Sequence, residues 1–157
     1  MDSGFSSYVP LALSSAMKGG CERCVAVERK SFDLNIVGSK EDILKITENG
    51  RGRRFSMFLP EPVALWLLRA WGRFRRSKSS SWCNRTRLLS RVYLLESRRN
   101  LAGKFLKLSV TKEGYSTFVI FPAGWNEKGW DKIFAAIEDI VGQFSMEPNL
   151  KLKGNGH

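Results

Sequence analysis

The chain carries an internal repeat with a period of 62 residues. Residues 43–46 read Ile-Leu-Lys-Ile and return at 105–108 as Phe-Leu-Lys-Leu, while Pro60 and Pro122, which close the next apolar run in each copy, keep the same offset. A fixed internal period indicates one supersecondary unit used twice. The repeat therefore predicts two related units, and each copy can be interpreted against the other.

The first copy predicts strands followed by a helix. Residues 31–36 alternate polar and apolar side chains, which is typical of a strand with one buried face, and 42–47 and 54–59 predict two more strands. Between the last two, the Asn49-Gly50 step favours a tight hairpin, because these residues accept positive φ. Pro62 then suits the first turn of a helix. The apolar residues that follow are spaced by three and four: Val63, Trp66, Leu67, Ala70, Trp71 and Phe74.

The second copy repeats this order, with strands predicted at 89–95, 103–110 and 116–121 and Asn126 as the cap of a helix. The helix has one continuous apolar stripe, formed by Trp130, Ile133, Phe134, Ile137, Ile140, Val141 and Phe144. Neither half can bury one apolar sheet face by itself. We therefore expect both halves to form one α+β domain.

The repeated segments resemble a PUR repeat, the unit of the purine-rich-element binding proteins. In the first copy the similar segments are Phe-Asp-Leu-Asn-Ile at 32–36, Ile-Leu-Lys-Ile-Thr-Glu at 43–48 and Arg-Phe-Ser-Met at 54–57. In the second copy, Tyr-Leu-Leu at 93–95 and Asn-Leu-Ala-Gly-Lys-Phe-Leu-Lys-Leu at 100–108 are similar to that family's strand, Asn-containing turn and Gly-Arg-Phe-Leu-Lys-Ile strand. The resemblance spans residues 25–145 and implies two interlocked units of four strands and a helix (ββββα) that bind single-stranded nucleic acid.

The plant Whirly proteins share that general architecture and are the rival resemblance, with a Lys-Gly-Lys-rich strand where this chain has Ala-Gly-Lys at 102–104. The turn at 38–42 reads Gly-Ser-Lys-Glu-Asp and lacks the Asn-x-x-Gly-Lys/Arg pattern. Nucleic-acid contacts carried by that turn are therefore in doubt for the first copy. A third repeat, which many PUR proteins use for dimerisation, has no room in 157 residues.

The positive charge is concentrated in the middle of the chain. The net charge is +11, and residues 51–107 hold 15 Lys or Arg residues against only Glu61 and Glu96. Cations that neutralise phosphates, beside aromatic faces that stack on bases, are typical of nucleic-acid binding. A solvated basic face, or a surface for acidic protein or lipid, is the alternative. The charge and the predicted architecture together favour single-stranded DNA or RNA as the partner.

Strand alternation selects the candidate site residues. If Leu106 and Leu108 point under the helix, Phe105 and Lys107 point to the opposite face, where Lys45 matches Lys107. The alternative is packing against the partner unit for Phe105 and simple solvation for the lysines. Arginines and a lysine in the turns add candidate phosphate contacts. The predicted nucleic-acid-binding residues are Lys45, Arg51, Arg53, Arg54, Arg98, Arg99, Lys104, Phe105 and Lys107.

The predicted organisation is a disordered tail at 1–20, one module at 21–146 and a flexible tail at 147–157. Within the module the repeats cover about 25–76 and 88–145, joined by a basic Ser-rich linker at 77–87. This linker could wrap nucleic acid, act as a nuclear-localisation signal or be an inert connector. Phosphorylation of the serines at 77–81 would lower its positive charge.

Catalysis has little support in the sequence. The only histidine is His157, the last residue, and Cys21, Cys24 and Cys83 provide three thiols without a fourth ligand for zinc. A Gly-rich phosphate loop followed by Lys and Ser or Thr is also missing from the sequence. We therefore predict no enzyme activity, no cofactor and no metal.

No apolar run approaches the roughly 20 residues of a membrane span, and the N-terminus is a poor secretory signal. The prediction is a nuclear protein with no membrane partner that acts in transcriptional regulation or RNA handling; cytoplasm or an organelle is the alternative location. A homo-oligomer is left open. The alternative function is a protein-interaction or dimerisation module of the same fold that has lost nucleic-acid binding.

Overall fold

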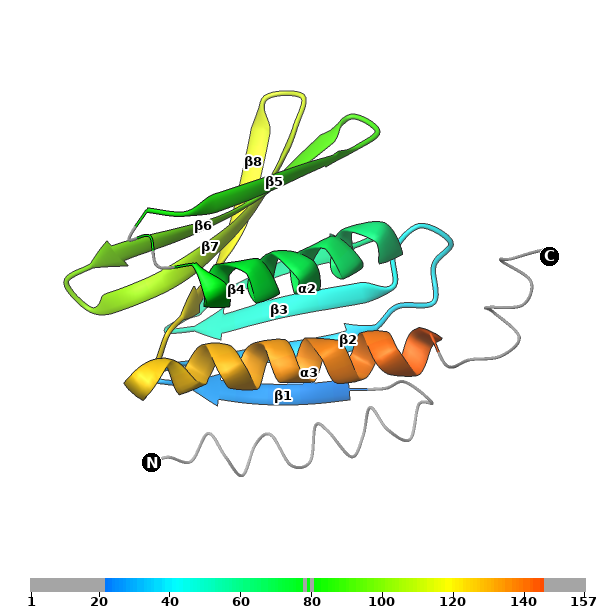
Figure 1. The fold of residues 1–157 in the computed structure, drawn as a ribbon. Coiled ribbons are helices and arrows are strands. Elements are labelled where there is room, and N and C mark those ends of the chain that lie inside the picture. Colours follow the sequence, from blue (N-terminus) through cyan, green and yellow to red (C-terminus); the bar gives the residue numbers. More distant parts are fainter. Residues whose placement is uncertain (1–21, 78, 80, 146–157) are drawn as a thin grey trace.

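The structure is a computed structural model that describes residues 22–77, 79 and 81–145. It has the predicted α+β class, with two ββββα units in tandem (Figure 1). The predicted tails at 1–20 and 147–157 lie outside the described residues, as does the side chain of Phe144.

The first unit is an antiparallel meander of four strands followed by helix α2. Its sheet pairs each strand with the next along the chain. The elements are β1 (Glu22–Val27), β2 (Lys30–Ile36), β3 (Leu44–Gly50), β4 (Arg53–Leu59) and α2 (Glu61–Arg76).

The second unit repeats this meander and ends in helix α3, preceded by a short 3₁₀ turn. Strands β6 and β7 are the longest of the described strands, and they pair along their full length. The elements are β5 (Cys83–Leu88), β6 (Arg91–Asn100), β7 (Gly103–Lys112), β8 (Tyr115–Pro122), η1 (Trp125–Glu127) and α3 (Lys128–Ser145).

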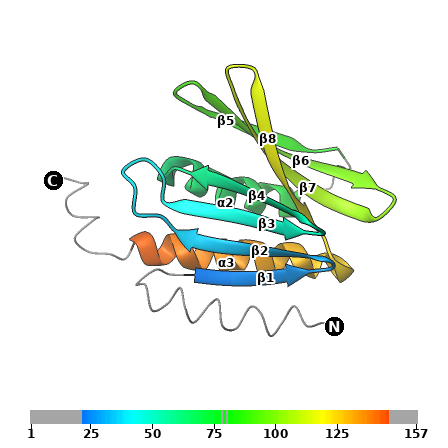
Figure 2. The same ribbon diagram turned by 180° about the vertical axis from the view of Figure 1, so that it is seen from behind.

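The two units are interlocked through their helices. Helix α3 of the second unit packs on β1 and β2 of the first, while α2 of the first unit contacts β5 and β6 of the second. The helices also contact each other and lie on the same side of the first sheet, in front of it in Figure 1 and behind it in Figure 2. Strand β8 meets β4 at the junction of the two sheets. One core is therefore built from both halves of the chain.

Alternating strand residues supply that core. Leu106 and Leu108 on β7 are fully buried, as predicted, and Phe32 on β2 reaches Phe121 on β8 with ring centroids 5.4 Å apart. The predicted stripe of α3 faces the same core, because Trp130, Ile133, Phe134, Ile137, Ile140 and Val141 are all buried.

A buried carboxylate also joins the two units. Glu48 on β3 accepts a hydrogen bond from the backbone N–H of Ile120 on β8, with Oε1 2.9 Å from the nitrogen. Its second oxygen, Oε2, lies 2.7 Å from Lys30 Nζ, and the Glu48 side chain is only 11% exposed. Both oxygens are therefore satisfied at the junction, as a buried carboxylate requires.

The hairpin between β3 and β4 differs from its prediction. Asn49 and Gly50 belong to β3, and the turn is formed by Arg51 and Gly52, with Gly52 at φ 64°. The Asn-Gly step was the wrong choice because Asn49 instead continues the ladder, opposite Arg54. Because glycine has no Cβ, Gly52 adopts this positive φ without a steric cost.

The prediction that Asn126 caps α3 is wrong. This residue lies inside η1 with φ 55°, and α3 begins at Lys128. The start of α3 approaches β1 closely. A Cβ on Gly129 would lie 2.5 Å from Val27 Cγ1, so only glycine fits there.

The predicted linker at 77–87 is partly wrong, because β5 occupies Cys83–Leu88. Polar residues stand on both of its faces, so the alternation of apolar side chains that marks a strand is absent. The positions facing α2 are Asn84, Thr86 and Leu88, and Asn84 Oδ1 accepts a hydrogen bond from Trp66 Nε1 at 2.8 Å. Leu89, predicted to begin the following strand, is instead an exposed turn residue with φ 57°.

Candidate nucleic-acid interface

Each sheet has an open face, defined here as the face opposite the buried side chains of its strands. The same pair of residue types occurs on both. On the first sheet, Lys45 Nζ of β3 lies 5.6 Å from the ring centroid of Phe58 on β4. On the second, Lys107 Nζ of β7 lies 4.6 Å from the ring centroid of Phe118 on β8. Phe58 and Phe118 are 42% and 41% exposed, and each has a lysine ammonium over its ring.

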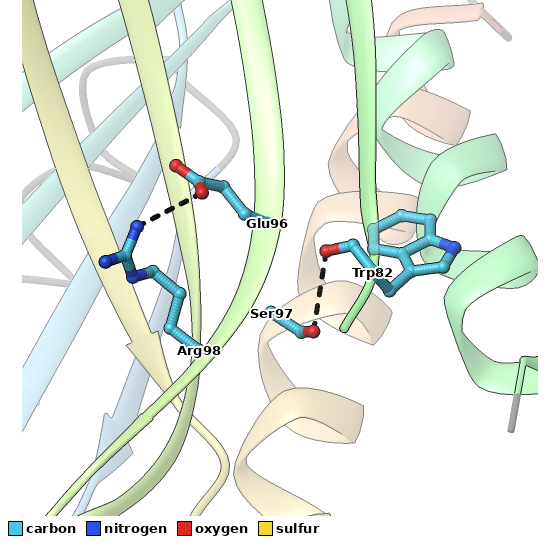
Figure 3. Close-up of polar contacts among 4 residues, drawn as sticks. All are labelled: Trp82, Glu96, Ser97 and Arg98. Atoms are coloured by element: carbon cyan, nitrogen blue, oxygen red, sulfur yellow. Dashed lines mark hydrogen bonds and ion pairs between the residues drawn. The ribbon is translucent and has the colours of Figure 1, made fainter. Parts of the chain in front are cut away.

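The open face of the second sheet is basic. The register of β5 to β8 aligns Arg85, Arg87, Arg98 and Lys107 on this face with one carboxylate, Glu96. Glu96 pairs with Arg98, with Oε1 3.2 Å from the guanidinium Nη1, so its charge is already compensated (Figure 3). Lys107 also stands opposite Glu96, whereas Arg85 and Arg87 lie opposite the apolar residues Leu94 and Val92.

The open face of the first sheet is electrically balanced. Lys45 and Arg54 are matched by Glu22 and Asp33. Its polar groups also satisfy one another, as Asn49 Nδ2 donates to Asp33 Oδ2 at 3.0 Å. This face therefore has less capacity to attract a polyanion than the second one.

The aromatic residue predicted for the site, Phe105, lies on the open face of the second sheet and is half-buried. It stands between Arg98 on β6 and Pro122 on β8. Phe118 is the more exposed aromatic on the same face. It offers more ring surface than Phe105 for stacking on a base.

The predicted arginines of the first unit gather at the β3–β4 hairpin. Arg51 is an exposed turn residue, and the Arg53 guanidinium carbon lies 4.6 Å from the ring centroid of Phe55, which is 41% exposed. Arg54 faces the opposite side of β4 from Arg53, on the open face. The three arginines therefore point in different directions at one end of the first sheet.

Arg99 and Lys104 lie on the opposite face of the second sheet from Lys107. They stand opposite each other in the β6–β7 register, on the face shared by Ser97. Figure 3 shows Ser97 pointing toward Trp82, while Glu96 and Arg98 point away from it. Arg99 and Lys104 line a cleft of about 580 Å³ whose wall includes Trp71, Phe74 and Arg75 of α2.

The nine predicted site residues are thus divided among four places. Arg98, Phe105 and Lys107 share the second open face, and Arg99 and Lys104 line the cleft, which Arg98 also reaches. Lys45 and Arg54 lie on the first open face, with Arg51 and Arg53 at the hairpin. Residues that the sequence did not single out complete these groups: Phe58, Arg75, Arg85, Arg87 and Phe118.

Cys24 lies on the first open face, and burial raises the pKa of its thiol to about 12. Its hydrogen bond to the Asp33 carboxylate raises the pKa further, because a neighbouring negative charge disfavours the thiolate. At pH 8, about one Cys24 thiol in ten thousand is ionised, and the thiolate is the reactive form.

We expect iodoacetamide at pH 8 to modify the exposed Cys83 rapidly and Cys24 slowly, because Cys24 is both half-buried and protonated. Trypsin cleaves after Arg23 and Arg29, so mass spectrometry of the digest reports Cys24 separately. Unfolding in urea should remove the protection. Equal labelling rates for both thiols in the native protein would contradict the burial of Cys24.

Within residues 22–77, 79 and 81–145, no three His, Cys, Asp or Glu side chains gather into a metal site. None of the helices in this part of the chain is both long enough and apolar enough to cross a bilayer. No protein-family model matches the chain, and a search of curated proteins finds no match.

Proposed function

We propose that this protein binds single-stranded DNA or RNA through the open face of its second sheet, as its resemblance to PUR and Whirly proteins implies. The corresponding role is transcriptional regulation or RNA handling in the nucleus. The observation that carries the proposal is the basic face formed by Arg85, Arg87, Arg98 and Lys107 around the exposed ring of Phe118.

The chemistry of this face suits an unpaired strand. Arginine and lysine contact phosphates and release the counterions that surround them. An exposed phenyl ring stacks on any base, because every base has a π-face. Lys107 Nζ lies 4.6 Å from the ring centroid of Phe118. This spacing suits simultaneous contact of the ammonium with a phosphate and of the ring with the neighbouring base.

The first sheet favours a different use. Its open face has balanced charge and internally bonded polar groups, which supports the alternative of a protein-interaction or dimerisation surface for that half of the molecule. The exposed Phe58 would then contribute apolar contact area. On this proposal the two repeats have divided their roles.

A polarisation titration with labelled single strands and the matching duplex tests the proposal. Because four cationic side chains line the face, we expect the logarithm of the association constant to fall with log salt with a slope of about −2 to −3. Single strands should bind more tightly than duplex, in which the bases are stacked on one another. Undetectable binding of single strands at low salt would refute the proposal.

Substitution of the two equivalent phenylalanines locates the binding face. Phe118→Ala should weaken single-strand binding by about 1–3 kcal/mol, the loss expected for one stacked base. Phe58→Ala is the matched control, since its ring is equally exposed beside a lysine and lies on the balanced face. Equal losses for both variants would show that binding does not discriminate between the sheets. Thermal melting of both variants checks that neither is unfolded.

A further inference from the structure

We infer that the cleft at the end of the second sheet is a binding site for a single nucleotide, with its phosphate against Arg99 and Arg75 and its base against the aromatic wall. The site differs from the open face, because Arg99 and Lys104 lie on the opposite side of β6 and β7 from Lys107. Arg98, whose strand position belongs to the open face, also lines the cleft. The inference rests on the proposed function where the nucleotide belongs to a bound strand. A free nucleotide has the same chemistry, and the experiment separates the two sources.

Size and shape agree with this ligand. The volume of about 580 Å³ lies within the range of small-molecule pockets, about 300–1,000 Å³. The cleft is lined by elements from both units, with α2 on one side and β6, β7 and η1 on the other. It therefore exists only where the two units meet.

The lining pairs cations with planar rings. Positive charge comes from Arg75, Arg98, Arg99 and Lys104, and aromatic surface comes from Trp71 and Phe74. The guanidinium carbon of Arg75 lies 5.4 Å from the ring centroid of Trp71, and Phe134 stacks on Trp71 with ring centroids 4.4 Å apart and an angle of 6° between the planes. This support fixes the indole as a rigid wall. A phosphate joined to a flat heterocycle is the ligand that matches both kinds of group.

One ion pair in the cleft limits the positive charge that is available to a bound anion. Lys104 Nζ lies 2.6 Å from Glu127 Oε2, and the cleft also contains Asp131. Arg99, directly opposite Lys104, has no ion pair with a described carboxylate. Two cations opposite each other repel, so an anion between them would be stabilised by both. Glu127 competes with such an anion for Lys104.

Calorimetric titrations of the full chain with adenosine 5′-monophosphate and with adenosine test the site. We expect the monophosphate to bind at least about tenfold more tightly than the nucleoside, and Arg99→Ala and Arg75→Ala each to weaken its binding about tenfold. Arg76→Ala is the matched control, because it is the neighbouring basic residue in the last turn of α2 and does not line the cleft. Its affinity for the monophosphate should equal that of the natural chain.

Glu127→Gln separates ligand binding from a structural role. It releases Lys104 and removes a negative charge, so we expect tighter binding of the monophosphate, by about threefold to tenfold. A lining residue with only a structural role would give no gain. Equal affinity for nucleotide and nucleoside, or unchanged binding in both Arg99→Ala and Arg75→Ala, would overturn the inference.

The source of the nucleotide follows from an eight-nucleotide single strand with and without a 5′-phosphate. Weaker binding of the strand to Arg99→Ala places part of the strand in the cleft, and a preference for the phosphorylated strand identifies that part as its end. If Arg99→Ala leaves the affinity for the strand unchanged but weakens binding of the monophosphate, the ligand is a free nucleotide. If the strand binds through Phe118 and the monophosphate does not bind at all, the proposed function survives and this site does not.

Discussion

Replacing Trp130 with alanine is expected to lower the free energy of unfolding by about 3–5 kcal/mol, the usual loss for a large aromatic residue in a core. Trp130 is 1% exposed and contacts Trp71 and Phe74 of α2, with ring centroids 6.1 Å and 5.2 Å away. Because it joins α3 to α2, its loss affects both units. Urea unfolding followed by circular dichroism measures the change.

Trp130→Phe is the graded control. It keeps most of the ring packing but removes the Nε1–H that donates to the Phe121 carbonyl at 2.8 Å. Because Phe121 also pairs with Leu106 in the β7–β8 ladder, the loss of this second hydrogen bond costs about 0.5–1.5 kcal/mol. The phenylalanine variant should therefore lie between the natural chain and Trp130→Ala. An unchanged midpoint for Trp130→Ala would contradict the burial of α3.

Glu48→Ala is expected to destabilise the protein by about 2–4 kcal/mol, because it leaves the Ile120 N–H and the Lys30 ammonium without their shared partner. The effect should appear as a lower urea midpoint with one cooperative transition, since the broken hydrogen bond to Ile120 joins the two units.

Glu48→Gln distinguishes the two bonds of Glu48. Its amide oxygen can still accept the Ile120 N–H, but the charge opposite Lys30 is lost. We expect a smaller loss than for alanine. If glutamine and alanine were equally destabilising, the ion pair would be the dominant contact, and the backbone bond to β8 would contribute little.

The parts of this fold that the sequence predicted are those with one clear apolar period. The stripe of α3 and the alternation at 31–36 could each be interpreted without tertiary information, since burial on one face leaves that pattern. Strand β5 was not predicted, because its inward positions include Asn84 and Thr86, which face α2 of the other unit. A polar strand held by a distant helix carries no local signal.

The candidate site was predictable only in part, for a related reason. Alternation correctly separated Phe105 and Lys107 from Leu106 and Leu108, because the β7 pattern differs between its two faces. In β8 the outward Phe118 is flanked by the inward Thr117 and Val119, and Ile120 and Phe121 follow. Two apolar faces cannot be told apart by period. The cleft depends on Arg75 meeting Arg99, which are brought together only by the docking of the units.

Each helix packs on the sheet of the other unit, and this has a consequence for synthesis on the ribosome. The apolar face of β1 and β2 is complete early, but α3, which covers it, is the last described element of the chain. At ordinary translation rates this surface waits about 5–20 s for its partner helix. A nascent chain in that interval exposes Phe32 and Leu34 and is a natural client for a holding chaperone. A stop codon anywhere before α3 would produce a chain that keeps this surface bare and is prone to aggregate.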